Sequence, residues 1–580
     1  MPALSEIVKR QIGQHFVFGF HGHELNDDMK TLIHEYHVGC FILMKRNVRD
    51  AFQVRRLIWD LQAFAKKCGH EQPLLIGTDQ ENGMVSAFSS PSAGTQFPGA
   101  MSIAATGSVE LAGEINLAIG KELASVGINW AYSPVADVNS DPRNPVIGVR
   151  SFGDDPNVVG EFACAVSKGL DGASVAACAK HFPGHGDTHV DSHLALPVIQ
   201  KSIEDLETLE LVPFKALISP SSSVATIMTG HMSLPALTGD MVPASLNRAV
   251  TTDLLRAKMG YNGVVVTDCL EMEAVAALEG GSEKAAVESL KAGADIAMIC
   301  HTLGRQTGAV KRTWDAYAAG EFEGEELQDS GRRITALKAR YAGSWEAALP
   351  AVDGITTQED AFKKQWSAMS ENHKKLSVEA YKKSIYVEKR DALPLARGRP
   401  VLLCTPETES LNRAIDDAEE LLRSEKGSIS NTAGSSFLSF AASMGQRTKV
   451  THIVYTQKPD NSPVLNDELK LASFDAVVIV LRNAQRSKWQ VENLMAVASR
   501  AAFEARSMKI VVMSSCEPYD ALELAAGSQL YGAGLKVGFL ASFEFTAPAL
   551  DAAAGIIFGE TRADGVMPVT RVKHRGAKHG

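Results

Sequence analysis

The chain has 580 residues, of which 45% are hydrophobic and 22% are charged, and its formal net charge is -10. This length exceeds the size at which a single hydrophobic core stops growing, so two or more domains are expected. The acidic balance argues against a nucleic-acid-binding protein, because no basic stripe is present to neutralise phosphates.

Residues 1–14 lack the apolar core of a secretory signal, and we find no apolar stretch of sequence long enough to span a bilayer. The eight cysteines include no C-x-x-C pair. Free thiols in a reducing compartment are therefore expected in place of disulfides or a zinc site. The sequence predicts a cytoplasmic protein that binds neither membranes nor nucleic acids.

Eight short apolar runs alternate with helical patterns up to about residue 340. The runs are 15–20, 39–44, 73–79, 129–138, 173–181, 224–231, 263–268 and 294–299. Helices are predicted between them, at 48–67, 108–126, 155–172, 203–218, 251–259 and 282–292. This pattern predicts a closed TIM-type (β/α)8 barrel, with a doubly wound open sheet as the alternative. The barrel is favoured because polar residues end many strands, whereas an open sheet concentrates them at one switch point.

The sequence after residue 345 predicts a connector followed by a smaller domain. Residues 346–398 form the connector after a barrel domain at 1–345, and its charged stretch 365–383 predicts an exposed helix. Apolar runs follow at 400–404, 451–456, 476–481, 509–514 and 535–539, with helices predicted at 408–423 and 491–505. We therefore expect an α/β/α sandwich over 399–580, in which the Ser/Gly-rich segment 427–443 is predicted to be a loop.

Ionisable residues gather at residues 180–193, directly after the apolar run 173–179. This segment contains one Lys, four His and two Asp. So many ionisable groups at the end of a buried strand are costly unless they bind or react with something. Other predicted strands also end in polar residues, namely Asp79, Asp137, His231 and Asp268. In a barrel these ends ring one face, so one common pocket is predicted.

Three of these residues have the properties needed to cleave a glycosidic bond, which takes a proton donor and, in retaining enzymes, an attacking carboxylate. Asp268 ends an apolar strand, which suits a rigidly held nucleophile. His193 can donate and accept a proton near neutral pH, and Asp191 can orient its ring. A loop histidine beside an aspartate, with no catalytic role, is the alternative interpretation.

The motif at 180–188, followed by Asp191-Ser192-His193, resembles the signature of glycoside hydrolase family 3 in its β-N-acetylglucosaminidase branch. Three further segments resemble family motifs, at 77–81, 144–153 and 267–272. The resemblance implies a barrel followed by an α/β sandwich, a retaining mechanism, and neither a metal nor an organic cofactor.

The resemblance also implies roles for individual residues. Asp268 would be the nucleophile, and His193, oriented by Asp191, would be the acid/base. Sugar contacts would fall on Asp79, Arg150, Lys180 and His181. His231 is a weaker candidate for substrate binding, with a buried supporting histidine as the alternative.

Two positions depart from the family pattern. Asn82-Gly83-Met84 stands where the family usually has Gly-Gly-Arg, and Cys269 stands where it has Asp or Ser. We expect a retaining exo-β-N-acetylglucosaminidase, monomeric or homodimeric, that acts on an oligosaccharide or glycoconjugate containing N-acetylglucosamine. A β-N-acetylglucosaminide phosphorylase and a catalytically silent sugar-binding protein remain alternatives.

Overall fold

The computed structural model describes residues 4–89, 93–188, 196–322, 325–349, 355–407, 434–457, 469–504, 508–526, 530 and 535–570. The chain divides into two compact units. The first unit comprises Met1–Phe97, Val109–Ile147 and Asp155–Ser377, and the second comprises Pro98–Ser108, Gly148–Asp154 and Val378–Gly580. The second unit therefore includes two short segments that lie, in the sequence, between elements of the first.

Among the described residues of the first unit, eight parallel strands close into a barrel. They are β1 (Phe16–Phe18), β2 (Cys40–Leu43), β3 (Leu75–Thr78), β6 (Trp130–Ala131), β7 (Ala176–Phe182), β8 (Thr226–Thr229), β9 (Val264–Cys269) and β10 (Ile296–Ile299). The strands follow one another around the ring in chain order, and β1 pairs with β10 to close it. Each predicted run overlaps one of these strands, so the barrel is confirmed and the open sheet is excluded.

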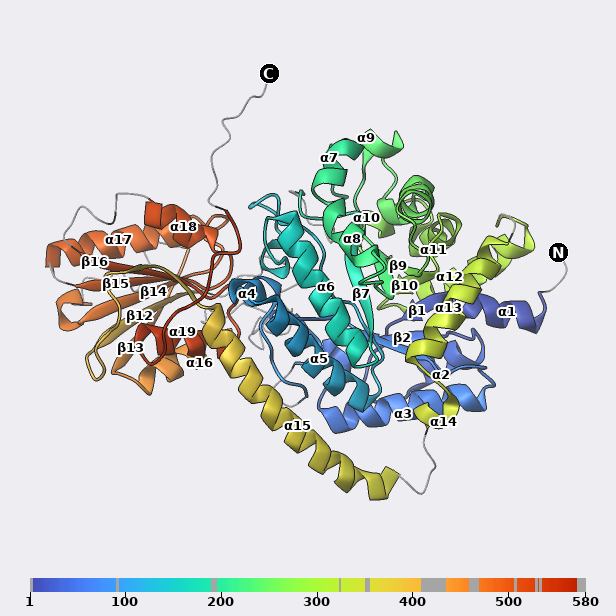
Figure 1. The fold of residues 1–580 in the computed structure, drawn as a ribbon, viewed down its shortest axis with the longest axis horizontal. Coiled ribbons are helices and arrows are strands. Elements are labelled where there is room, and N and C mark those ends of the chain that lie inside the picture. Colours follow the sequence, from blue (N-terminus) through green and yellow to red (C-terminus); the bar gives the residue numbers. More distant parts are fainter. Residues whose placement is uncertain are drawn as a thin grey trace. The chain divides into compact units, whose positions relative to one another are not determined.

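Helices surround the barrel strands (Figure 1). Those of the first unit are α1 (Glu6–Gly13), α2 (Asp27–His34), α3 (Ala51–Lys67), α5 (Val109–Val126), α6 (Pro156–Gly172), α7 (Ile203–Thr208), α8 (Leu211–Ile218), α9 (Pro235–Thr238), the π-helix η4 (Ala249–Lys258), α10 (Glu273–Ala276), α11 (Gly281–Lys291), α12 (Leu303–Ala318), α13 (Glu326–Tyr341) and α14 (Trp345–Ala348). The long helix α15 (Ile355–Ser384) follows and contains the predicted helix at 365–383.

The predicted helix at 203–218 is wrong as a single element. The structure has α7 and α8 in its place, with a break at residues 209–210. Pro213 explains the break, because a proline has no N–H to donate to the carbonyl of Leu209 and its ring clashes with that carbonyl.

A short hairpin that was not predicted follows β3. It consists of β4 (Gln80–Asn82) and β5 (Val85–Ser86), which pair antiparallel. Asn82 and Gly83 turn the chain with φ angles of 68° and 59°. Positive φ at both residues is typical of a tight hairpin turn, for which Asn-Gly is a favoured sequence.

The second unit contains a six-stranded sheet among its described residues. Its order is β11 (Tyr386–Arg390), β16 (Lys536–Ala541), β15 (Lys509–Ser514), β14 (Ala476–Leu481), β12 (Val401–Pro406) and β13 (Val450–Tyr455). The strands are parallel except β11, which runs antiparallel to β16. Helices α17 (Trp489–Glu504) and α18 (Tyr519–Ala526) lie on one face, and α16 (Gly434–Gly445) and α19 (Ala547–Ile557) lie on the other (Figure 1). This arrangement is the predicted α/β/α sandwich.

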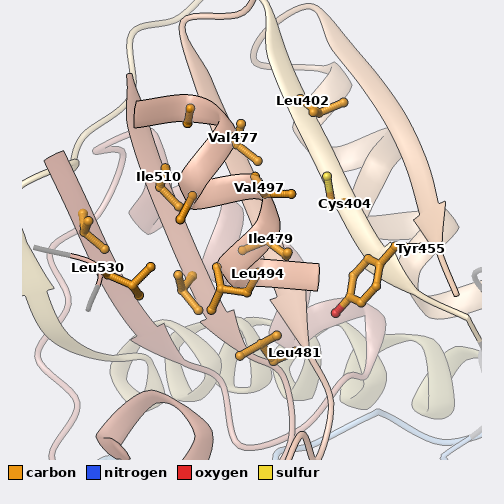
Figure 2. Close-up of a cluster of buried hydrophobic side chains, with 14 of the residues drawn as sticks. Leu402, Cys404, Tyr455, Val477, Ile479, Leu481, Leu494, Val497, Ile510 and Leu530 are labelled. Carbon is orange, nitrogen blue, oxygen red and sulfur yellow. The ribbon is translucent and has the colours of Figure 1, made fainter. Parts of the chain in front are cut away.

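The core of the sandwich forms where α17 covers the sheet. Figure 2 shows Leu494 and Val497 of α17 close to Val477 and Ile479 of β14, and all four side chains are buried. The strand residues alternate in sequence, so they point to the same face of the sheet. Burial of these side chains stabilises the unit by roughly 2 kcal/mol for each.

The predicted loop at 427–443 is wrong from residue 434 onward, where α16 begins. Phe437, Phe440 and Met444 are buried along one side of this helix. Their spacing is helical, and the burial of three large side chains outweighs the weak helix propensity of Ser439 and Ser443 between them. The predicted helix at 408–423 lies outside the described residues.

Among the helices that the structure describes, none combines the length and the apolar character that a membrane span requires. The eight cysteines are free thiols. This agrees with the prediction that they form no disulfide framework.

Candidate active site

The carboxyl ends of the barrel strands carry most of the predicted site residues. Asp79 follows β3, Lys180 and His181 lie near the end of β7, His231 follows β8, and Asp268 lies near the end of β9. Because all eight strands are parallel, these ends lie on one face of the barrel. The fold thus brings residues that are distant in sequence to a common face.

Lys180 lies between two carboxylates on this face. Its Nζ is 2.7 Å from Oδ1 of Asp79 and 2.7 Å from Oε1 of Glu81. The Lys180 and Glu81 side chains are only 3% and 4% exposed, whereas that of Asp79 is 33% exposed. The buried ammonium is therefore charge-compensated, and Asp79 is the member of the three with the greatest access to a ligand.

His181 is oriented by Asp137, which is fully buried. Nδ1 of His181 lies 2.7 Å from Oδ2 of Asp137, and the amide of His185 donates to Oδ1 at 2.8 Å. Burial by itself raises the pKa of Asp137, but the interactions with His181 and His185 outweigh it and hold that pKa below its usual value. The ionised carboxylate therefore accepts a hydrogen bond from Nδ1–H, which fixes the orientation of the imidazole ring.

The loop after β7 is held against the loop after β6. The side-chain amide of Asn144 donates to the carbonyl of His185 at 2.7 Å and to Oγ1 of Thr188 at 3.2 Å. Gly186 allows this approach, because a Cβ at that position would lie 1.6 Å from the carbonyl oxygen of Val138. The glycine of this motif is therefore needed for close backbone contact.

Asp191 and His193, the predicted acid/base pair, lie outside the described residues. The described residues on either side of them are joined, since Nζ of Lys201 lies 3.1 Å from Oδ2 of Asp187. Lys201 also lies 2.5 Å from Oε1 of the buried Glu210. Lys201 thus connects Asp187, which precedes Asp191 and His193 in the chain, to Glu210, which directly precedes α8.

Asp268 lies near the end of β9, the strand whose preceding residues 264–266 are fully buried. Its Oδ1 accepts a hydrogen bond of 2.7 Å from the backbone amide of Cys269. A half-buried carboxylate on a rigid strand, with one oxygen held by an amide, has the properties required of a nucleophile.

His231 is completely buried and bonded to the protein through both ring nitrogens. Nε2 lies 2.9 Å from the carbonyl oxygen of Cys269, and Nδ1 lies 2.7 Å from Oγ of Ser245. Since the carbonyl can only accept, Nε2 donates to it, and Nδ1 shares a hydrogen bond with the Ser245 hydroxyl. These contacts favour the alternative that His231 supports the end of β9 and does not contact the sugar.

Arg150 ends the single turn η2 (Gly148–Arg150) and is buried. It belongs to the second unit, whereas the other described site residues belong to the first.

Sequence reasoning missed two members of the site. Glu81 shares the Lys180 ammonium with Asp79, and Asp137, although recognised as a strand-end residue, was not assigned the role of orienting His181. The Asn82-Gly83 turn was a signal for the hairpin that carries Glu81. The partner of Asp137 has no such local signal, because His181 lies 44 residues away.

A cavity of about 820 Å³ lies elsewhere in the first unit. Residues of α1 and α13 line it, together with residues that precede strands, namely His15 before β1, His37 before β2 and His70 before β3. Among the described residues that line it, none is a predicted site residue. Since the amino ends of parallel strands lie opposite their carboxyl ends, this cavity is separate from the candidate site.

The barrel unit, which contains most of the candidate site, is similar to known protein sequences. The model of the glycosyl hydrolase family 3 N-terminal domain matches residues 7–337, which is more than half of the chain. The chain is 38% identical over 341 residues to beta-hexosaminidase A of Pseudoalteromonas piscicida, covering 55% of this chain and 56% of that protein. It is 35% identical over 286 residues to a beta-hexosaminidase of Thiobacillus denitrificans, covering 48% of this chain and 76% of that protein. The chain thus spans little more than half the length of the first of these relatives.

Solved structures extend the similarity to the second unit. A glycoside hydrolase family 3 beta-N-acetylglucosaminidase from Paenibacillus sp. matches with a TM-score of 0.81 and 32% identity, covering 98% of this chain and 99% of that one. A fungal multi-domain GH3 beta-N-acetylglucosaminidase matches with a TM-score of 0.83 and 34% identity, covering 99% of this chain and 62% of that one. Together with the barrel and its strand-end carboxylates, the match over residues 7–337 shows that the chain belongs to glycosyl hydrolase family 3.

Proposed function

We propose that the protein is a retaining exo-β-N-acetylglucosaminidase that releases terminal N-acetylglucosamine from an oligosaccharide or glycoconjugate. The observation that carries this proposal is the placement of Asp268 on the same barrel face as the Lys180–Asp79–Glu81 and Asp137–His181 groups. The names of the similar proteins, beta-hexosaminidase and beta-N-acetylglucosaminidase, support the choice of sugar.

In the first step, Asp268 attacks the anomeric carbon while the protonated His193 gives its proton to the departing oxygen. The glycosidic bond breaks, the aglycone leaves with the proton, and the sugar is bound to Asp268 as an ester. In the second step, the now neutral His193 removes a proton from water, and the resulting hydroxide displaces Asp268. Two displacements at the same carbon retain its configuration.

The remaining groups position the sugar. Asp79 accepts hydrogen bonds from sugar hydroxyls, and Lys180 and Nε2 of His181 line the same face. A fixed array of this kind lowers the barrier by holding the anomeric carbon close to Asp268. Arg150 remains a sugar contact predicted from the sequence.

A chromogenic aryl N-acetylglucosaminide tests this proposal against the matching aryl glucoside. We expect the N-acetylglucosaminide to be hydrolysed far faster, and both Asp268→Asn and His193→Ala to lose most of that activity. Assays in phosphate buffer distinguish the phosphorylase alternative, which would release a sugar 1-phosphate in place of the free sugar. Binding of N-acetylglucosamine without turnover by the wild type would instead support the silent sugar-binding protein.

A further inference from the structure

A cysteine stands beside the proposed nucleophile, at the position where the sequence departs from the family pattern. Sγ of Cys269, a carboxylate oxygen of Glu271 and an imidazole nitrogen of His301 all lie within 4.8 Å of one another. Within the described part of the chain, these are the one set of three Cys, His, Asp or Glu side chains with such mutual proximity.

Neighbouring strands fix this cluster. Cys269 ends β9 opposite Met298 of β10, and His301 lies two residues beyond the end of β10. The backbone amide of His301 donates to Oε2 of Glu271 at 2.6 Å. The three side chains are therefore held close together by the end of β9 and by the segments that directly follow β9 and its neighbour β10.

Glu271 provides an independent indication of a ligand. Its side chain is only 5% exposed, yet Oε1 is buried and accepts no hydrogen bond in the described structure. Nη1 of Arg305 lies 3.7 Å from this oxygen, beyond hydrogen-bonding distance, and the Arg46 guanidinium also interacts electrostatically with Glu271 without donating a hydrogen bond to Oε1. A buried carboxylate oxygen without a hydrogen bond is costly, and a bound cation would compensate it.

The three donor types together select a particular metal. Thiolate, imidazole and carboxylate are the protein ligands of Zn²⁺, and three of them leave a fourth tetrahedral position for water. With bonds of about 2.0–2.3 Å, ligand atoms around a tetrahedral zinc lie roughly 3.5 Å apart. The cluster thus reaches that geometry with small side-chain adjustments.

We propose that Cys269, Glu271 and His301 bind Zn²⁺, and that the bound ion inhibits the enzyme. On binding, the Cys269 thiol releases its proton to solvent and becomes a thiolate ligand. His301 gives up its 3.2 Å contact with Nη1 of Arg46. Arg46 retains hydrogen bonds to the carbonyls of Phe20 and Cys300, so its charge stays satisfied.

The inhibitory part rests on the proposed function, whereas metal binding itself does not. A divalent cation bound by the residue next to Asp268 attracts that carboxylate and lowers its nucleophilicity. The expected metal is thus a reversible inhibitor of this chain and not a cofactor of its chemistry. Asp or Ser, the residues usual in the family at this position, would not supply the thiolate.

Metal binding is tested with Co²⁺, whose thiolate complexes absorb in the near ultraviolet, and by competing Co²⁺ with Zn²⁺. The wild type is expected to bind one ion per chain with a thiolate band. Cys269→Ser should lose the band and bind Zn²⁺ at least about tenfold more weakly, and His301→Asn should bind about tenfold more weakly. Cys68→Ser, a half-buried thiol elsewhere in the barrel domain, is the matched control and should behave as the wild type. Equal binding by wild type and Cys269→Ser would overturn the site.

Inhibition is measured separately on the aryl N-acetylglucosaminide. Zn²⁺ should abolish wild-type turnover reversibly, with recovery on adding EDTA. Cys269→Ser, measured relative to its own turnover without metal, should need at least tenfold more Zn²⁺ for the same fractional inhibition. Equal sensitivity of the two proteins would contradict the inhibitory role. Absence of wild-type hydrolysis would contradict the proposed function alone, because the Co²⁺ measurement is independent of turnover.

Discussion

Nδ1 of His181 lies 2.7 Å from Oδ2 of Asp137, a fully buried residue in the segment after β6. The same carboxylate also accepts the backbone amides of His181 and His185. One aspartate therefore sets both the ring orientation of His181 and the path of the loop that leads toward Asp191 and His193.

Replacing Asp137 by Asn should impair both stability and catalysis. The amide keeps one acceptor oxygen but loses the charge and places an NH₂ group against donors. We expect a loss of about 3 kcal/mol in unfolding free energy and a fall of at least tenfold in kcat/KM. Urea unfolding and steady-state kinetics measure the two effects. Asp60→Asn, which removes an exposed ion pair with Arg56, is the control and should cost under about 0.5 kcal/mol. A similar loss in both variants would contradict the role of Asp137.

Replacing Lys180 by Met should leave two carboxylates facing each other. Asp79 and Glu81 both lie 2.7 Å from the ammonium in the wild type, so its removal creates repulsion in a buried setting. We expect a loss of about 3 kcal/mol in stability and a large fall in kcat/KM. Adding Glu81→Gln should restore part of the stability but not the activity, because Lys180 is proposed to contact the sugar. A double-mutant cycle measures this coupling, and strict additivity would argue against it.

The second unit should become less stable as the pH rises. Burial raises the pKa of Glu517 and of Asp520 to about 7 in each case. Between the unfolded values near ~4 and the folded value, the folded state binds more protons than the unfolded state, so stability decreases with increasing pH. We expect a loss of about 1–3 kcal/mol between pH 5 and pH 8. Hydrogen exchange of peptides from β14 and β15, with rates corrected for pH, measures this local stability. A rise in protection over the range would contradict the assignment.

The barrel could be predicted from the sequence because its strands are buried on both sides and read as short apolar runs. Val264, Val265 and Val266 of β9 illustrate this. The predicted bounds of helices and strands were least accurate where a single residue interrupts the backbone hydrogen bonding. Pro213, for example, divides the predicted helix at 203–218 into α7 and α8. Such effects depend on single positions and are lost in a pattern averaged over a segment.

The sequence predicted those residues of the candidate site that lie at the ends of apolar strands. Asp79, Lys180, His181 and Asp268 all fall on one face because a parallel barrel aligns its strand ends. Pairings across that face were not predictable, since the contact of Lys180 with Glu81 joins residues separated by about a hundred positions. The inclusion of Arg150 in the second unit likewise depends on tertiary contacts. The acid/base assignment of His193 and Asp191 stays a prediction of the sequence.

Covalent trapping identifies the residue that attacks the anomeric carbon. The protein is treated with 5-fluoro-N-acetylglucosaminyl fluoride, whose second fluorine slows hydrolysis of the glycosyl ester, and its peptides are analysed by mass spectrometry. We expect one sugar adduct per chain on the peptide containing Asp268, and no adduct in Asp268→Asn. An adduct on another carboxylate, or undiminished turnover of a chromogenic N-acetylglucosaminide by Asp268→Asn, would contradict this expectation.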